Sequence, residues 1–369
     1  MKFCPNCGYK LTEGSKFCPN CGYQLPESGE KVAQKSKTSV GNKQSKARKS
    51  KTKIRLNYSE IFSELFKHHS TEDAEKIFAW GVKRPSLDQI DINTIHPWIF
   101  LRVFSCLFIA CAVFFFTMNV SNIGAGGFSF FAALLMPFSI MVLFYEINIT
   151  REVSFYNMLK SLLVSGILSG IISLVIFLIT SQSQTFTSMV TGGNMTAFDA
   201  FMQAALPEEI AKSVVVIYMI VKIKPNYLLC GIAIGIAVGA GFAILETSGY
   251  IISEAVKSSE LLTAIGRGLS AFGGHISWAA IEAGGIMLAK KQNSFNIGDI
   301  FSFSFIAAII STMILHTAWD TFYIGGISFN NLTSGIKMCV CAFIAFGIVL
   351  YLTKKGIVEL VDLKAANDK

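Results

Sequence analysis

Long runs of apolar residues dominate the chain from residue 97 to residue 353. Each run is close to the roughly 20 residues that an α-helix needs to cross a bilayer. The predicted spans are residues 98–118, 126–145, 160–180, 201–222, 228–249, 262–288, 301–321 and 333–353. The pattern therefore predicts an all-α polytopic membrane protein with about eight transmembrane helices.

Composition supports the same fold class. Hydrophobic residues make up 52% of the chain and charged residues only 15%, whereas a soluble domain carries roughly 25% charge. The polar residues concentrate before residue 97, and much of the net charge of +8 comes from a lysine-rich stretch there. We therefore expect an integral membrane protein preceded by a polar, basic segment.

A short sequence repeat opens the chain. Residues 2–11 (KFCPNCGYKL) recur almost unchanged at 16–25 (KFCPNCGYQL), and each copy holds one C-x-x-C-G turn. Four thiolates at this spacing are typical of a structural zinc site. The pattern predicts a zinc ribbon over residues 1–27, with one zinc ion on Cys4, Cys7, Cys18 and Cys21. The alternative is a domain closed by disulfides, which a reducing cytosol disfavours.

Two further segments separate this ribbon from the membrane. Residues 28–55 are rich in Lys, Ser, Gln and Gly, which predicts a disordered basic linker. Residues 56–96 have helix-like apolar spacing, and Ser70 before Glu72 and Asp73 is typical of a helix start. We interpret 56–96 as a cytoplasmic helical neck, 97–354 as the membrane domain and 355–369 as a cytoplasmic tail. The linker is interpreted as a tether and topology signal rather than a nucleic-acid site.

Positive charge alternates between the loops that connect the spans. Arg151 and Lys160 follow the second run, Lys222 and Lys224 the fourth, Lys290 and Lys291 the sixth, and Lys354 and Lys355 the eighth. The intervening loops hold a single lysine, Lys257. The positive-inside rule then places both termini in the cytoplasm.

Ionisable side chains stand inside four consecutive spans, where each costs at least about 2.5–3.5 kcal/mol on insertion scales. They and their polar or aromatic neighbours are Glu208, Glu209 and Lys212 in the fourth span, Phe242 and Glu246 in the fifth, Arg267, His275 and Glu282 in the sixth, and His316, Trp319 and Asp320 in the seventh. By the predicted topology most of these groups lie in the outer half of the membrane, with His275 nearer the middle.

The spacing of these groups suggests hydrolytic chemistry. Glu208 and Lys212, one turn apart, are expected to pair, as are His316 and Asp320. A glutamate in a low-dielectric site can take a proton from water, and a histidine can stabilise an oxyanion or protonate a leaving amine.

The set resembles the PrsW-type intramembrane proteases, relatives of the CAAX prenyl endopeptidase and Abi superfamily. The motifs that carry the resemblance are Glu208-Glu209-x-x-Lys212, Phe242-x-x-x-Glu246, Arg267 with His275, and His316-x-x-Trp319-Asp320, and more weakly Tyr145-Glu146. The resemblance covers roughly residues 95–350 and leaves the zinc ribbon outside.

The resemblance implies roles for these residues. Glu208 or Glu209 would activate the water with help from Glu246, while His275 and His316 would form the electrophilic side and Asp320 would orient His316 or contact substrate. Lys212, Phe242, Arg267 and Trp319 would support the site. The resemblance also implies a membrane-anchored protein substrate and the cell membrane of a prokaryote. A cytoplasmic protein is the expected partner of the zinc ribbon.

Several alternatives remain at the level of the sequence. Glu and His ligate zinc as readily as they act without it; the lack of an H-E-x-x-H motif favours a glutamate-type mechanism with no catalytic metal. The same polar residues could line a proton- or ion-coupled transporter, or stabilise a non-catalytic membrane scaffold or sensor. Glu282 has no place in the family pattern and is interpreted as a partner for a cation or a proton relay.

Overall fold

The architecture was obtained as a computed structural model. It describes residues 2–3, 10–11, 61–91, 95–117, 122–180, 197–255, 271–324 and 332–367. The chain divides into two units, Met1–Lys53 and Ile54–Lys369. In the first unit, β1 (Lys2–Phe3) pairs antiparallel with β2 (Lys10–Leu11). These strands flank the first C-x-x-C turn, but the four cysteines and the predicted linker lie outside the described residues.

Helices make up the regular structure described in the second unit. They are α2 (Thr71–Phe78), η1 (Leu87–Gln89), α3 (Ile99–Thr117), α4 (Asn122–Ile147), α5 (Phe155–Thr180), α7 (Ala197–Ala200), the π-helix η3 (Phe201–Ala205), α8 (Leu206–Ile223), α9 (Leu228–Ala255), η4 (Ala271–Gly273), α11 (His275–Lys290), η5 (Ile297–Phe301), α12 (Phe303–Ile324) and α13 (Leu332–Asn367). The predicted all-α class is confirmed.

Six helices of the described chain are long and apolar enough to cross a membrane: α3, α4, α5, α9, α12 and α13. The prediction was eight, and the two that differ are α8 and α11. Glu208, Glu209 and Lys212 lower the hydropathy of α8, and α11 is only 16 residues long. However, the chain is helical without a break from Ala197 to Ile223, or about 40 Å at 1.5 Å per residue.

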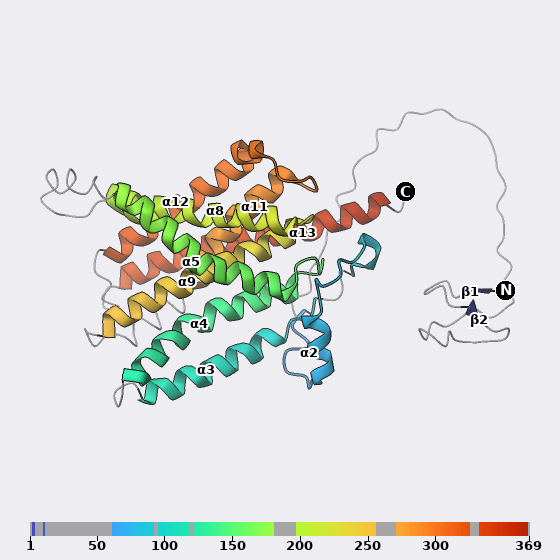
Figure 1. Cartoon of the computed structure of the whole chain (residues 1–369), viewed down its shortest axis with the longest axis horizontal. Coiled ribbons are helices and arrows are strands. Elements are labelled where there is room, and N and C mark those ends of the chain that lie inside the picture. The colour runs from blue at the N-terminus through green and yellow to red at the C-terminus, as the bar shows by residue number, and fades with distance from the viewer. Residues whose placement is uncertain are drawn as a thin grey trace, which may run out of the picture. The chain divides into compact units, whose positions relative to one another are not determined.

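The most buried of the six apolar helices is α9, in which 89% of the most apolar stretch is buried inside the protein. It contacts α4, α5, α8, α11 and α13, and Figure 1 shows it between the α3–α4 pair and α11. Gly231, Gly235 and Gly239 recur every fourth residue along its α11 side. A Cβ atom on Gly235 would lie 2.5 Å from the carbonyl oxygen of Ala279. Close approach of α9 and α11 therefore depends on these glycines.

The neck contains the helix predicted from Ser70. The Ser70 side chain accepts from the Asp73 amide, and the Asp73 side chain accepts from the Ser70 amide, which forms a capping box. The Tyr145 hydroxyl donates to the carbonyl oxygens of Ile77 and Trp80 at 2.9 and 3.1 Å. Tyr145 therefore ties the carboxyl end of α2 to α4.

Glu146 caps the amino end of α3. Its carboxylate accepts hydrogen bonds from the backbone N–H groups of Trp98, Ile99 and Phe100 at 2.8, 2.9 and 2.9 Å. These are among the first amides of α3, which have no partner inside the helix. The resemblance at Tyr145-Glu146 thus falls on two helix caps.

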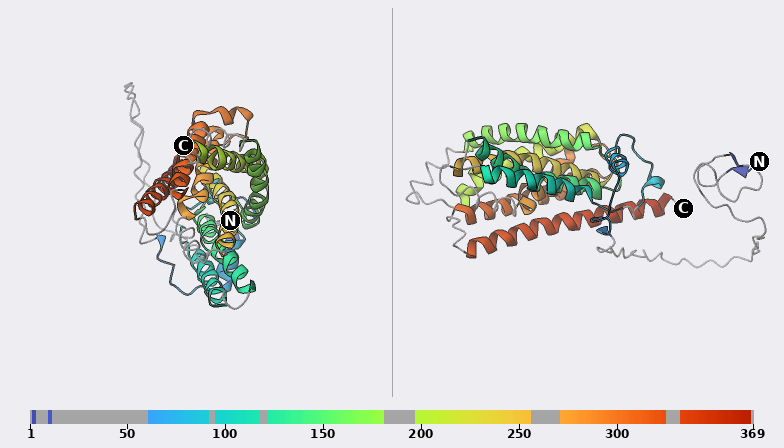
Figure 2. Two further views of the ribbon diagram at one scale, coloured as in Figure 1. Left: turned by 90° about the vertical axis from the view of Figure 1, so that its left-hand side faces the viewer. Right: turned by 90° about the horizontal axis from the view of Figure 1, so that it is seen from below.

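The last helix extends well past the predicted eighth span. α13 continues to Asn367, through the segment interpreted as a tail, and projects beyond its neighbours (Figure 2). Its far end packs on the neck, where Lys364 donates to the carbonyl oxygen of Ile90 and Leu360 is fully buried. The continuous helix thus holds the neck against the membrane part.

Candidate active site

Four helices bring the predicted polar residues together. Glu208, Glu209 and Lys212 come from the first turns of α8, and Glu246 comes from α9. His275 is the first residue of α11, and His316 lies in the second half of α12. The sequence placed His275 deeper, near the middle of a span over 262–288. Instead, α11 starts at this residue, so the imidazole lies level with the others.

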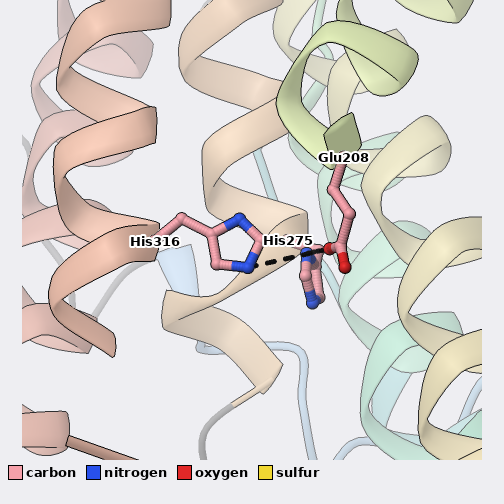
Figure 3. A group of neighbouring side chains, drawn as sticks. All are labelled: Glu208, His275 and His316. Carbon is pink, nitrogen blue, oxygen red and sulfur yellow. Dashed lines mark ion pairs between the residues drawn. The ribbon is translucent and has the colours of Figure 1, made fainter. Parts of the chain in front are cut away.

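Glu208 lies against both imidazole rings, as Figure 3 shows. Its Oε2 atom is 3.8 Å from Nδ1 of His275 and 3.7 Å from Nε2 of His316. The two ring centroids are 5.2 Å apart. Among the described residues this buried oxygen has no hydrogen-bond partner. A buried carboxylate oxygen left without a donor indicates a site that normally binds something else.

Each imidazole is fixed by a second carboxylate on its other nitrogen. Nε2 of His275 is 2.7 Å from Oε2 of Glu246, and Nδ1 of His316 is 2.6 Å from Oε1 of Glu209. We assign the ring N–H in each case to the nitrogen that contacts this carboxylate. The other nitrogen lies toward Glu208, where Nδ1 of His275 also contacts Lys212 and Nε2 of His316 also contacts Asp320. Both rings therefore place one nitrogen toward the Glu208 carboxylate.

Lys212 compensates part of the negative charge. Its Nζ atom donates to Oε1 of Glu209 at 2.6 Å and lies 2.7 Å from Nδ1 of His275. The predicted Glu208–Lys212 pair is wrong: Lys212 pairs with Glu209, three residues before it, because the Glu208 side chain turns toward the histidines. The ammonium also lies 4.9 Å from the ring centroid of Phe242, a cation–π contact.

Asp320 lies on the same side of the His316 ring as Glu208. Its Oδ2 atom is 3.3 Å from Nε2 of His316, one turn earlier on α12, as the spacing predicted. Its side chain is 22% exposed and that of Glu208 is 16% exposed, while Glu209 is fully buried. Glu208 and Asp320 are thus the two carboxylates at this nitrogen that a water molecule could reach.

Comparison with protein families agrees with this geometry. The model of the "PrsW family intramembrane metalloprotease" matches residues 157–352, which is just over half of the chain. The chain belongs to the PrsW family. The matched range contains every helix that contributes to the site. A zinc-ribbon domain matches residues 3–25, and neither a curated protein nor a solved structure matches the chain.

Membership of the PrsW family establishes the coarse function: the protein is an intramembrane protease and an integral membrane protein. The zinc ribbon implies one structural zinc ion. The preference for a metal-free mechanism is not supported, because the family is described as metalloproteases and the site offers suitable ligands. The H-E-x-x-H motif was a poor guide, since here the candidate ligands come from three different helices.

The three residues of Figure 3 fit a metal ion. Glu208, His275 and His316 each offer one ligand atom, and these atoms lie within 4.8 Å of one another. Two imidazoles and a glutamate form the donor set of several catalytic zinc sites, with zinc about 2.0–2.1 Å from each atom. Carboxylates on the remote ring nitrogens are a recurring feature of such sites. To reach those bond lengths, the three ligand atoms would have to approach one another by roughly 1 Å.

Sequence reasoning missed one residue of this PrsW-family site, Trp278. Its ring stacks on His316 with centroids 4.4 Å apart and meets His275 edge-on at 4.9 Å. It also lies near Trp319, at 6.2 Å between centroids. Trp278 stands three residues after His275 on the same helix face, which was the available signal. It separates the imidazoles from the rest of the bundle.

Two further predicted residues are Arg267 and Glu282. Arg267 lies outside the described residues. Glu282 is fully buried two turns beyond His275, and its Oε1 atom accepts a hydrogen bond from Thr312 at 3.0 Å. This contact joins α11 to α12, and the Glu282 carboxyl also interacts with the side chains of Glu209 and Ser213 on α8, so Glu282 adjoins the polar group. A role in proton transfer stays a prediction.

Proposed function

We propose that this protein hydrolyses a peptide bond of a membrane-anchored protein at a centre formed by Glu208, His275 and His316. The observation that carries the proposal is the unpartnered Glu208 oxygen, which lies 3.8 and 3.7 Å from a nitrogen of each of two imidazoles. A polar point of this kind, walled by Trp278 and Phe242, can hold a water molecule next to an incoming peptide carbonyl.

The metal ion that this donor set fits would be held by Glu208, His275 and His316. Bound there, it would polarise the peptide carbonyl and lower the pKa of water. Glu246 and Glu209 keep the two rings in the tautomers that binding requires. Lys212 offsets the charge of Glu209, and a divalent cation would offset part of the charge of the remaining carboxylates.

Asp320 is the proposed proton acceptor. It lies beside His316 Nε2 on the edge that Glu208 faces, and it is not the carboxylate that fixes either ring. As the water oxygen bonds to the carbonyl carbon, Asp320 Oδ2 takes a water proton. It then returns that proton to the amide nitrogen as the C–N bond breaks. This differs from the sequence-based suggestion of Glu208 or Glu209. Here Glu208 belongs to the metal-binding group, and Oε1 of Glu209 is already in contact with Lys212 and His316.

The proposed topology follows from the alternation of charged loops. Both termini lie in the cytoplasm, and α8 and α11 cross the membrane with the six longer helices. α11 is almost entirely buried, and α8 buries Glu209 and Lys212 against neighbouring helices, which lets these two helices carry charge. Cleavage then takes place in the outer half of the bilayer.

The proposal is tested with the full-length protein in liposomes and a single-span reporter. Wild type should cleave it and hold two zinc equivalents, one in the ribbon and one in the site. His316→Ala should lose cleavage and one equivalent, whereas Asp320→Asn should lose about 100-fold or more in rate and keep both. Cys4→Ser serves as the control, with the ribbon zinc lost and cleavage retained.

Two outcomes would contradict the proposal. One is cleavage at the wild-type rate by His316→Ala, which would place the chemistry elsewhere. The other is flux of protons or ions across the liposome with no cleavage, which would favour the transporter. Loss of a metal equivalent in Asp320→Asn would make Asp320 a ligand rather than a proton acceptor.

A further inference from the structure

A cavity of about 590 Å³ lies beside the site, between the α7–η3 segment and α12. Apolar atoms line it almost completely. The lining residues are Ala197, Phe201, Ile310, Met313, Ile314, Thr317, Ala318 and Thr321. We call it the α7–α12 groove. None of its lining residues belongs to the polar group described above.

The α7–α12 groove is continuous with the catalytic group along α12. At about 100° per residue, Met313 and Thr317 lie roughly 60° and 100° around the helix from His316. They form the side of the groove nearest the imidazole. On the opposite wall, the π-helix η3 leads directly into Pro207 and Glu208. Segments of π-helix interrupt regular helices most often at functional sites.

The outer side of the groove is open. Ile314 and Ile310 are 63% and 50% exposed, and Phe198 on α7 is 56% exposed. In an integral membrane protein such apolar surfaces face the hydrocarbon of the bilayer. The groove therefore opens sideways to the hydrocarbon next to the catalytic group.

We infer that the α7–α12 groove binds the apolar transmembrane segment of the substrate beside the bond that is cleaved. This inference rests on the proposed function and adds the class of substrate. The lining offers no charged group, so apolar side chains are bound and charged ones are excluded by the loss of their hydration. A volume near 590 Å³ is in the range of pockets that hold a ligand of several side chains.

Site-directed photo-crosslinking tests the inference. Ile314 is replaced by a benzophenone amino acid in the Glu208→Gln background, so that contact does not require hydrolysis. The probe is a single-span peptide of about 20 leucine and alanine residues, reconstituted with the full-length protein. Ile109 is the matched control, because it is the same residue type, lies near the middle of α3 and is 62% exposed.

We expect at least 10-fold more crosslink to the peptide from position 314 than from position 109. Equal crosslinking from both positions, or crosslinks from 314 to phospholipid only, would overturn the inference. Cleavage of the same peptide by wild type is measured separately. Wild-type cleavage without a crosslink at 314 refutes the groove alone, whereas a crosslink without wild-type cleavage refutes the proposed function alone.

A second variant fills the groove. Ala318→Trp should lower both the crosslink from position 314 and cleavage by at least 10-fold, with an unchanged melting temperature. Ile109→Trp should change neither. If Ala318→Trp folds and cleaves the peptide at the wild-type rate, the α7–α12 groove is not where the substrate binds.

Discussion

The glycines of α9 offer a graded perturbation of the site. Gly239→Ala should displace the first turn of α11, because the new methyl group would overlap the carbonyl oxygen of His275. At Gly235 the corresponding Cβ would be 2.5 Å from Ala279, about 1 Å short of ordinary contact near 3.4 Å. The contact at Gly239 is tighter still. The backbone cannot rotate away as a side chain could, so the helices must separate by about 1 Å.

The expected magnitude follows from that shift. Overpacking costs typically 1–3 kcal/mol in stability, and a misplacement of about 1 Å at a catalytic group can lower the rate 100-fold. His275 is the residue that moves, so Gly239→Ala should lose activity per folded molecule as well as thermal stability. The assay is reporter cleavage in liposomes, normalised to the folded fraction and combined with the melting temperature in detergent.

Two variants on the same helix calibrate the result. At Gly231 the new methyl group meets the flexible Met287 side chain, so Gly231→Ala should have a small effect. At Gly249 nothing lies within 4 Å, so Gly249→Ala should leave activity unchanged. Wild-type cleavage and melting in Gly239→Ala would refute the reasoning, since the close contact of α9 and α11 would then not position His275.

Three further predictions concern the rest of the chain. Glu146→Ala removes the acceptor for three amides at the start of α3 and should destabilise the protein by about 2 kcal/mol, which chemical denaturation should show. Cleavage per folded molecule should stay within two-fold of wild type, which corresponds to a change of about 0.4 kcal/mol in the activation free energy. The ribbon should hold zinc through thiolates, so a full-length Cys7→Ser variant that keeps all its zinc by elemental analysis would contradict the ribbon assignment. A reporter fused after Lys369 should be accessible only from the cytoplasmic side, and labelling from the outside would contradict the proposed topology.

Much of the fold was predictable because hydropathy and helix length depend on local sequence. The apolar runs marked α3, α4, α5, α9, α12 and α13, although α13 continues well past its predicted end. The capping box at Ser70 was readable because a cap involves residues three apart. By contrast, α8 and α11 resist a hydropathy reading, since Glu208, Glu209 and Lys212 place charge where a span should be apolar.

The sequence could predict that these polar residues form a group, but not which of them contact one another. Charge inside apolar runs identified Glu208, Glu246, His275 and His316 without any knowledge of packing. Which groups pair depends on side-chain directions across four helices, and spacing along one helix cannot supply them. The clearest example is the ion pair of Lys212, which forms with Glu209 and not with Glu208. The α7–α12 groove was invisible for the same reason, because its walls are separated by more than 100 residues.

The central claim is that Glu208 and the two imidazoles form one hydrolytic centre. The most direct measurement is mass spectrometry of the reporter after incubation with purified wild type or Glu208→Gln in liposomes. We predict that wild type yields two fragments. Their masses should place the cleaved bond within the outer half of the transmembrane segment. The Gln variant, which keeps the shape of the side chain and removes its charge, should melt as wild type does and yield neither fragment. If the folded Gln variant produces the same fragments at a similar rate, the centre is not where this account places it.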